Sequence, residues 1–336
     1  MGDEQTNNQV LIRELPTAEL TVDAFELATG PVPEPADGEV LCRTLLLSID
    51  AANRAWMQGA TYRGALSAGQ VMDGFTLARV EDSKADGISV GDIVECQNGW
   101  QDLAVHPARA VSRVELRGEL SHHLSVLGVS GLTAYHGLLG VGRPVARQTV
   151  VTSAAAGAAG NVAAQIARIV GCRSVGVAGT DEKCRMLVDD LGLDAAINHR
   201  SPEFRTELKA ACPDGIDVYF DNTGGDILEA ALFRMNQGGT IVCCGVVSQY
   251  DTSSPAPGPR GVPGLLVTKR LRMEGFIVMD FADGHGAAIE ELAGWIDSGE
   301  LRVLEDPYDG LESAPEALVD LLAGGNVGKR FVRVAS

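Results

Sequence analysis

The 336-residue sequence predicts an α/β protein in which a β-rich part is combined with a doubly wound parallel sheet. The length is about that of two domains of ~150 residues. Forty glycines and fourteen prolines with only 5% aromatic residues indicate many turns and close backbone approaches, not a coiled coil. The hydrophobic pattern also changes near residue 125, from short strands separated by turns to alternating strands and helices.

The β-rich part extends from about residue 9 to residue 120. Strands are expected at 40–50, 75–81 and 92–96, and the turn Val90-Gly91-Asp92 introduces the last of them. The segment from Thr29 to Gly38 contains three prolines and is expected to be a loop.

The second part is a series of short apolar runs with helices between them. Unbroken apolar runs are typical of a parallel sheet that is covered on both faces. Helices are expected at 181–191, at about 289–298, and around Val162, Ile166, Ile169 and Val170, which are spaced by three and four residues. After the helix near 289–298 the chain is expected to return to the β-rich part, so residues 1–125 and 303–336 form one domain and residues 126–302 the other. The expected strands are 148–152, 174–178, 195–198, 216–220, 240–244 and 271–278.

Charge and cysteine content limit the partners and the location. The 27 basic and 45 acidic residues give a net charge of −18, which disfavours nucleic acid and anionic membrane surfaces as partners. No apolar run approaches the ~20 residues of a membrane span, and the amino end is polar and acidic, unlike a secretory leader. Seven scattered cysteines are typical of a reduced, cytoplasmic protein.

A loop of small residues, from Ser153 to Gly160, follows the first strand of the second part. The pyrophosphate of a dinucleotide lies against the amino end of such a helix, so nothing bulky can stand between them. Only Gly157 and Gly160 of the G-x-G-x-x-G pattern are glycines, and Ala155 stands at the first position. Small residues also serve tight helix–strand packing, which is the alternative reading. The preceding strand, the following helix and the next strand about twenty residues on favour a dinucleotide site.

The end of the next strand favours NADP(H) over NAD. Gly179 leaves room for a 2′-phosphate, Thr180 can donate a hydrogen bond, and Lys183 and Arg200 can meet an anion. Asp181 keeps NAD open as an alternative, because an acidic residue here can bind the ribose hydroxyl. The two cations could also be solvated surface charges.

The first part lacks the pattern of a zinc site. It contains only Cys42 and Cys96, and His106, His122 and His123 have no ligand spacing. We therefore expect no metal. An oxidoreductase without a metal must polarise its substrate with hydrogen bonds alone.

Several strings together are specific for one family. The sequence resembles, from residue 40 to residue 333, the zinc-independent medium-chain reductases that saturate activated C=C bonds. These include the prostaglandin and leukotriene B4 reductases, the plant alkenal double-bond reductases and bacterial curcumin reductase. The matching strings are 128–135, 154–160, 178–183, 221–225, 244–250, 271–276 and 325–329.

The resemblance implies a GroES-like first domain, a Rossmann second domain and the residues that contact NADP(H). His199 stands where the family has a tyrosine, so either His199 or Arg200 is expected to replace that phosphate contact. The nicotinamide half of the site is expected to involve Cys244, Gly245, Val246, Ser248, Tyr250, Phe276, Ile277, Val278 and Asn326. The remaining expected contacts are Gly157, Ala158, Ala159, Gly160, Gly179, Thr180, Lys183 and Asn222.

Three side chains are expected at the substrate: Tyr62, Met72 and Tyr250. Tyr62 is equally compatible with a core or rim position. The first domain departs from the family at Ile49 to Met57, where the Asp-Pro-Tyr run is missing, so no relative's substrate preference can be copied. Tyr250 is the expected catalytic residue; its alternative is an exposed tyrosine beside a mobile loop, 251–263, that could act as a lid.

The function that these features predict is NADPH-dependent reduction of the C=C bond of α,β-unsaturated ketones or aldehydes. Hydride reaches the β-carbon, an enolate forms, and the α-carbon is protonated. The main alternative is a quinone reductase on the same scaffold. A carbonyl-reducing dehydrogenase and a non-catalytic NADPH-binding sensor also remain open. The family resemblance further implies a homodimer, with 271–278 as the segment that could pair across the interface.

Overall fold

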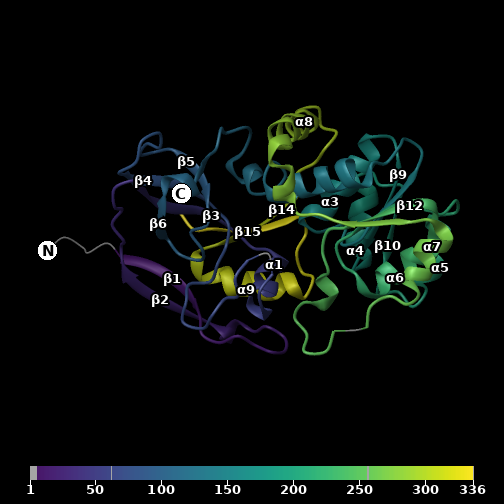
Figure 1. The fold of residues 1–336 in the computed structure, drawn as a ribbon, viewed down its shortest axis with the longest axis horizontal. Coiled ribbons are helices and arrows are strands. Elements are labelled where there is room, and N and C mark those ends of the chain that lie inside the picture. Colours follow the sequence, from purple (N-terminus) through teal and green to yellow (C-terminus); the bar gives the residue numbers. More distant parts are fainter. Residues whose placement is uncertain (1–5, 62, 256, 336) are drawn as a thin grey trace.

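The computed structural model describes residues 6–61, 63–255 and 257–335, which form two domains side by side (Figure 1). The Rossmann domain contains strands β8 to β13. The sheet domain contains β1 to β7 together with β14 and β15, which return from the end of the chain and lie among the amino-terminal strands.

The Rossmann domain is built on a six-stranded sheet whose neighbours all pair in parallel, in the order β10-β9-β8-β11-β12-β13. This order reverses between β8 and β11, as in dinucleotide-binding folds. The predicted doubly wound sheet is therefore confirmed. Its strands are β8 (Thr149–Thr152), β9 (Arg173–Ala178), β10 (Ala195–Asn198), β11 (Ile216–Asp221), β12 (Met235–Cys243) and β13 (Arg272–Gly275).

Helices cover both faces of this sheet because its strands are apolar on both sides. Val150 belongs to one buried cluster with residues of α3 and α8, whereas Val151 belongs to the cluster on the other face, with residues of α5 and α6. The helices are α2 (Val129–Tyr135), the π-helix η4 (His136–Gly142), α3 (Ala158–Ile169), α4 (Asp181–Asp189), α5 (Phe204–Ala211), α6 (Gly225–Arg234), η5 (Val247–Gln249), α7 (Val262–Lys269), η6 (Val278–Gly284) and α8 (His285–Asp297).

The sheet domain has a seven-stranded sheet in the order β14-β15-β3-β4-β5-β7, with β6 paired to β3. Its strands are β3 (Glu39–Ser48), β4 (Thr76–Ser83), β5 (Ile93–Cys96), β6 (Leu103–Pro107), β7 (Ser112–Arg113), β14 (Glu305–Asp309) and β15 (Lys329–Arg333). A second, two-stranded sheet consists of β1 (Thr6–Ile12) and β2 (Phe25–Pro31).

Two α-helices belong to this domain, α1 (Ala51–Gln58) and α9 (Ala314–Leu322), and they contact each other. Residues of α9 pack in one buried cluster with Val10, Leu47 and Trp100. The short 3₁₀ turns are η1 (Val22–Ala24), η2 (Ala108–Ala110), η3 (Leu120–His123) and η7 (Leu311–Ser313).

Two sequence expectations are wrong in part. The loop expected at 29–38 begins only after Pro31, because Thr29, Gly30 and Pro31 pair with β1 at the end of a two-stranded sheet, where proline is tolerated. The last strand expected at 271–278 ends at Gly275, and Val278 already begins a 3₁₀ helix. Within the described residues, no helix has the length and apolar character needed to cross a membrane.

Candidate active site

The loop between β8 and α3 brings the backbone of the Rossmann domain close to the cleft between the domains. A Cβ atom at Gly160 would lie 2.2 Å from the carbonyl oxygen of Ala154, so only glycine permits this helix to start so close to the strand. Ala154 itself has a φ of 48°, a left-handed conformation that is unfavourable for alanine. Gly157 is the N-cap of α3. This geometry leaves the first amides of α3 next to a surface without side-chain bulk.

Asp221 fixes the adjacent strand end. Its Oδ1 accepts hydrogen bonds from the amides of Thr223 (3.0 Å) and Gly224 (2.9 Å) and from the hydroxyl of Tyr219 (3.0 Å). Burial raises the pKa of Asp221, while these hydrogen bonds act in the opposite direction. The next residue, Asn222, donates from its amide to the hydroxyl of Ser153 (2.8 Å) and from its side chain to the Ser153 carbonyl (2.7 Å). These bonds hold the carboxyl ends of β8 and β11 together at the point where the strand order reverses.

Cationic and small residues gather at the end of β9. A Cβ atom at Gly179 would lie 3.5 Å from Nε2 of His199 and 3.7 Å from Nε of Arg200, so both side chains lie beside this glycine. Thr180 caps α4 by accepting a hydrogen bond from the amide of Lys183 (3.2 Å). Burial and the neighbouring charge of Arg200 lower the pKa of His199, so its imidazole is mostly neutral at pH 7.

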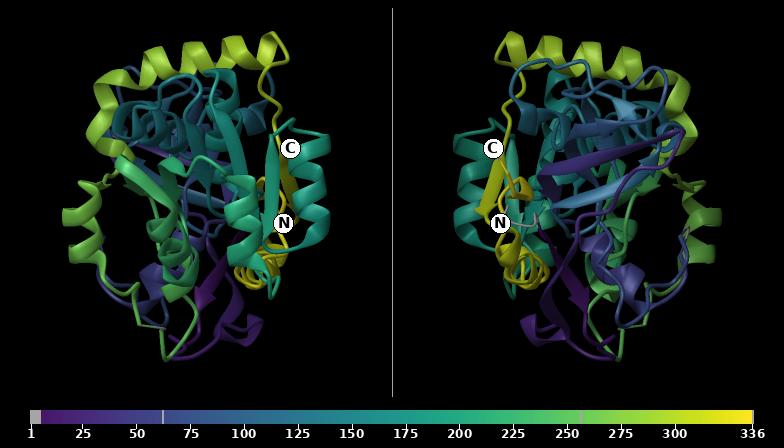
Figure 2. Two further views of the ribbon diagram at one scale, coloured as in Figure 1. Left: turned by 90° about the vertical axis from the view of Figure 1, so that its right-hand side faces the viewer. Right: turned by 90° about the vertical axis from the view of Figure 1, so that its left-hand side faces the viewer.

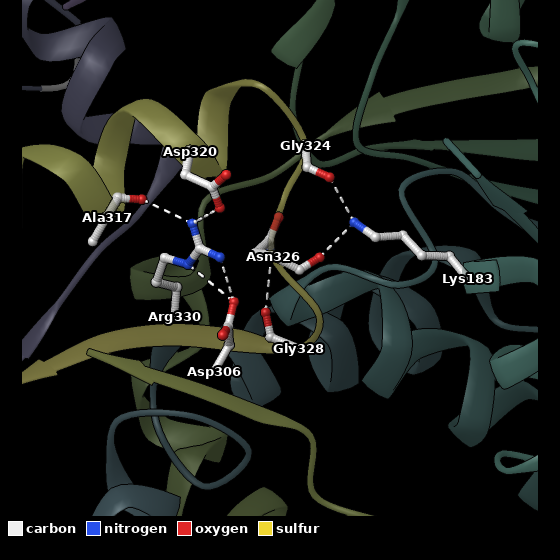
Figure 3. A network of polar contacts seen from close by, with 8 residues as sticks. All are labelled: Lys183, Asp306, Ala317, Asp320, Gly324, Asn326, Gly328 and Arg330. Atoms are coloured by element: carbon white, nitrogen blue, oxygen red, sulfur yellow. Dashed lines mark hydrogen bonds and ion pairs between the residues drawn. The ribbon is translucent and has the colours of Figure 1, made fainter. Parts of the chain in front are cut away.

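Lys183 connects this cluster to the far wall of the cleft. Its Nζ donates to the carbonyl oxygens of Gly324 (2.7 Å) and Asn326 (2.6 Å), which lie in the loop between α9 and β15 (Figure 3). Burial, together with the positive charges of Arg330 and Arg200, lowers the pKa of Lys183. An anion bound in the cleft would offset the repulsion between Lys183 and these two arginines and so favour the charged form of Lys183.

Arg330 supports the same loop from the sheet domain (Figure 3). Its side chain is 3% exposed and donates to the carboxylates of Asp306 and Asp320 and to the carbonyl of Ala317, 3.1 Å away. Burial disfavours its charge, but the two carboxylates outweigh that effect and leave the pKa of Arg330 above its ordinary value. The buried Lys329 beside it bonds to Asp50, at the start of α1. The loop is therefore attached to both domains.

These elements enclose a cleft of about 400 Å³ between the two domains. Twelve of the residues expected at the cofactor line this cleft, including residues expected at its phosphates and residues expected at its nicotinamide. They are Gly157, Ala158, Ala159, Gly160, Gly179, Thr180, Lys183, His199, Arg200, Asn222, Ser248 and Asn326.

The other expected residues do not line this cleft. Met72 is fully buried in the core of the sheet domain with Trp100, and Val278 packs against Leu132 and Ala288. Ile277 is 38% exposed, and Tyr250 lies two residues after the cleft-lining Ser248. Tyr62 lies outside the described residues. Cys244, Gly245, Val246 and Phe276 also lie outside the cleft lining.

The Rossmann-domain cysteines nearby do not supply a thiolate. Burial, together with the negative charge of Asp221, raises the pKa of Cys243 to about 11 and that of Cys244 to about 12. Both are therefore protonated near neutral pH. Within residues 6–61, 63–255 and 257–335, no three His, Cys, Asp or Glu side chains are grouped so that they could hold a metal ion.

Sequence reasoning missed the wall contributed by the sheet domain. Asp50, Arg330 and the segment Leu321–Gly324 line the cleft, yet they lie far apart in sequence from the phosphate loop. One signal was available: Lys329 and Arg330 are two adjacent cations in a strand that the structure buries, and buried cations require carboxylate partners. Asp221 could also have been found, as an acidic residue at the end of a buried strand.

Comparison with known proteins agrees with this architecture. Residues 8–114 match a family model described as the N-terminal domain of oxidoreductase, and residues 158–294 match one described as zinc-binding dehydrogenase. The chain is 37% identical to the NADPH-dependent curcumin reductase of Escherichia coli, with 100% of this chain and 99% of that protein covered. It is 35% identical to the NADP⁺-dependent 2-alkenal reductase of Nicotiana tabacum, with the same coverage.

A solved structure is similar over the whole chain. CurA from Vibrio vulnificus in complex with NADPH superimposes with a TM-score of 0.93 at 35% identity, over 98% of this chain and 99% of that chain. The fold and the matched models define a two-domain oxidoreductase. Within that class, the chain belongs to the zinc-independent medium-chain reductases. The predicted family is thus confirmed.

Replacing Arg330 by methionine should lower the free energy of unfolding by about 2 kcal/mol, because the charged hydrogen bonds of the buried guanidinium to Asp306 and Asp320 are lost. Urea unfolding followed by circular dichroism measures the change. The matched control is Arg333→Met, three residues along the same strand, where the side chain is 50% exposed, forms an ion pair with Asp309 and lies over the ring of Phe331. We expect that variant to change stability by less than about 1 kcal/mol. Equal effects of the two substitutions would contradict the role given to Arg330.

Proposed function

We propose that this protein is an NADPH-dependent reductase of the C=C bond of α,β-unsaturated ketones and aldehydes. The observation that carries the proposal is one cleft that combines a small-residue helix start with two cations at the end of β9. The relatives named for reduction of curcumin and of 2-alkenals, 37% and 35% identical over the whole chain, support the reaction type.

The residues present fit NADP(H). Gly157 to Gly160 leave the amino end of α3 open to the pyrophosphate. Gly179 leaves space beside His199 and Arg200, which we assign to the 2′-phosphate. Lys183 has three N–H donors, and its two bonds to the loop at Gly324 and Asn326 use two of them. We assign the third donor to the same phosphate, so that binding of the cofactor and attachment of this loop depend on one ammonium group.

When bound, NADPH supplies the hydride for the β-carbon of the substrate. Negative charge then moves to the carbonyl oxygen, and the site must offer a hydrogen-bond donor there. We assign this role to the hydroxyl of Tyr250, which follows the cleft-lining Val247 and Ser248. The enolate is protonated at the α-carbon by Tyr250 or by water.

We also propose that the enzyme is a cytoplasmic homodimer whose domains divide at 125/126 and 302/303. Seven free cysteines support the location. Among the residues that the structure describes, the short strand β13 pairs with β12 alone and lies at the edge of its sheet, and Met273, Ile277 and Met279 near it are exposed. An unpaired edge with apolar side chains is suited to a second copy of the chain. The return of β14 and β15 to the sheet domain supports the domain division.

The direct test is to follow NADPH absorbance with a panel of enals, enones, dienones and quinones, with NADH in parallel reactions. We expect oxidation of NADPH with enones or enals, and we expect mass spectrometry to find the saturated carbonyl compound. An allylic alcohol as product would instead indicate carbonyl reduction. Turnover of quinones alone would favour the quinone reductase, and cofactor binding without any turnover would favour a sensor.

Replacing Gly179 by aspartate should lower kcat/KM for NADPH by about tenfold or more, because a carboxylate at this position repels the 2′-phosphate and pairs with Arg200. The value for NADH should change much less. Gly179→Ala is the control, since its Cβ meets only ordinary contacts, at 3.5 Å and beyond, and adds no charge. Equal losses with both cofactors would place the 2′-phosphate elsewhere.

Replacing Tyr250 by phenylalanine should lower kcat by about 100-fold and change KM little, since the hydroxyl acts in the transition state. Steady-state kinetics with the best enone of the panel measure kcat and KM. A fluorescence titration measures whether NADPH binding is unchanged. Turnover equal to that of the wild type would remove Tyr250 from the mechanism.

A further inference from the structure

A buried arginine in α1 joins three segments of the chain at one point. Nε of Arg54 donates to Oδ1 of Asp251 across 2.8 Å. Its Nη2 donates to the carbonyl oxygens of Pro16 (3.0 Å) and Ala18 (2.7 Å). The same carboxylate oxygen of Asp251 accepts from the amide of Leu20, 2.6 Å away. The contact therefore links α1 and the segment 16–20 of the sheet domain to the loop that follows η5.

Because the contact is buried, Arg54 and Asp251 depend on each other as charge partners. The Arg54 side chain is fully buried and that of Asp251 is 20% exposed, so a charge left without its partner there is costly. Nη1 of Arg54 is also buried and has no hydrogen-bond partner among the described residues. Asp251 has a φ of 54°, a left-handed conformation that aspartate and asparagine adopt more readily than other non-glycine residues. The side-chain bonds to Arg54 and Leu20 stabilise this conformation further.

The loop from Val247 to Asp251 is attached to both domains. At its start, the amide of Val247 donates to the carbonyl of Asn222 (3.2 Å) and that of Ser248 to the carbonyl of Thr223 (3.0 Å), both in the Rossmann domain. At its end, Asp251 is attached to the sheet domain. In both views of Figure 2 the green chain of this region lies beside the blue helix α1. Tyr250 lies between the two attachments.

We propose that Arg54 is a positioning residue that acts through Asp251 to fix Tyr250 in the loop that follows the cleft-lining Val247 and Ser248. The inference rests on the proposed function, because it assigns Arg54 an effect on a tyrosine that donates to the substrate oxygen. One end of the loop is hydrogen-bonded to the Rossmann domain and the other to the sheet domain. The position of the Tyr250 hydroxyl therefore depends on how the two domains are placed relative to each other. Loss of the ion pair leaves the cofactor residues in place and removes the attachment of this loop at Asp251 to the sheet domain.

The test variant is Asp251→Asn. Asparagine has nearly the same size, tolerates the left-handed conformation and still offers an oxygen to the amide of Leu20, so only the charge is removed. We expect kcat for enone reduction to fall about tenfold, as for a displaced catalytic group, while the dissociation constant of NADPH stays within about twofold. Glu81→Gln is the matched control, because Glu81 pairs with Arg43 at 3.1 Å in the sheet domain and neither residue lines the cleft. It should leave both quantities unchanged.

Two readouts separate positioning from general support of the fold. In the Tyr250→Phe background, Asp251→Asn should lower kcat less than twofold further, because its effect passes through the hydroxyl that is already absent. Amide hydrogen exchange of residues 247–251 in the protein without NADPH should increase in Asp251→Asn while the strands of both sheets keep their protection. Additive effects on kcat, or unchanged exchange in this loop, would overturn the inference.

Arg54→Lys tests the other side of the pair. Lysine keeps the positive charge but lacks the planar fork that reaches Asp251 and two carbonyls at once, so its kcat should lie between that of the wild type and that of Asp251→Asn. A value at or below that of Asp251→Asn, with intact exchange protection in the sheets, would contradict positioning through the charge. Failure of wild-type protein to reduce any enone would instead reject the proposed function, and the exchange measurement would still test the attachment of the loop.

Discussion

The structure depends on one stretch of backbone, Gly324 to Arg330, that contacts the Rossmann domain at one end and the sheet domain at the other. Gly328 forms a β-bridge with Gly157 of the phosphate loop, and its amide donates to the carbonyl of Ala156, 2.8 Å away. A Cβ atom at Gly328 would lie 2.2 Å from the carbonyl of Leu304, and its φ is 74°, so this close approach requires glycine. Two residues further on, Arg330 enters the sheet domain with its two carboxylate partners. The distance between the walls of the cleft is therefore set by main-chain contacts, and every side chain of the site is placed relative to them.

The charge around the cleft differs from that of the whole protein. The chain carries 45 acidic and 27 basic residues, yet Lys183, Arg200 and Arg330 all line the same cleft. The carboxylates of Asp306 and Asp320 pair with Arg330, whereas Lys183 bonds to neutral carbonyls and keeps its charge for the cleft. An acidic surface repels anions in general, so a cationic cluster of this kind gives selectivity for an anion that also fits the small-residue loop. Binding should accordingly weaken with rising ionic strength.

Local sequence patterns predicted those parts of the fold that local physics determines. The small residues from Ser153 to Gly160 and the apolar runs of β8 to β12 follow from steric and packing rules that act over a few residues. The end of β2 could not be predicted in this way, because Pro31 is acceptable in a strand only where the pairing leaves an edge, and that depends on β1. Met72 was expected at the substrate but lies in the core against Trp100, since burial is decided by packing between distant segments. For the same reason, Asp50 and Arg330 were not predicted at the cleft, because their position there comes from the pairing of β15 with β3.

The pairing of β15 with β3 also affects the order in which the chain can fold. Ser48 lies opposite Phe331 in the sheet, so this end of β3 meets β15 only after the strands of the Rossmann domain, which lie between them in the sequence, have been synthesised. The six parallel strands between them are complete much earlier, and domains fold as units during synthesis. We therefore expect the Rossmann domain to fold before the sheet domain is complete, while Leu46 to Ser48 of β3 still lack β15 as their neighbour. Pairing of β15 with β3 is then the step that completes the cleft, because it places Gly328 against Gly157 of the phosphate loop.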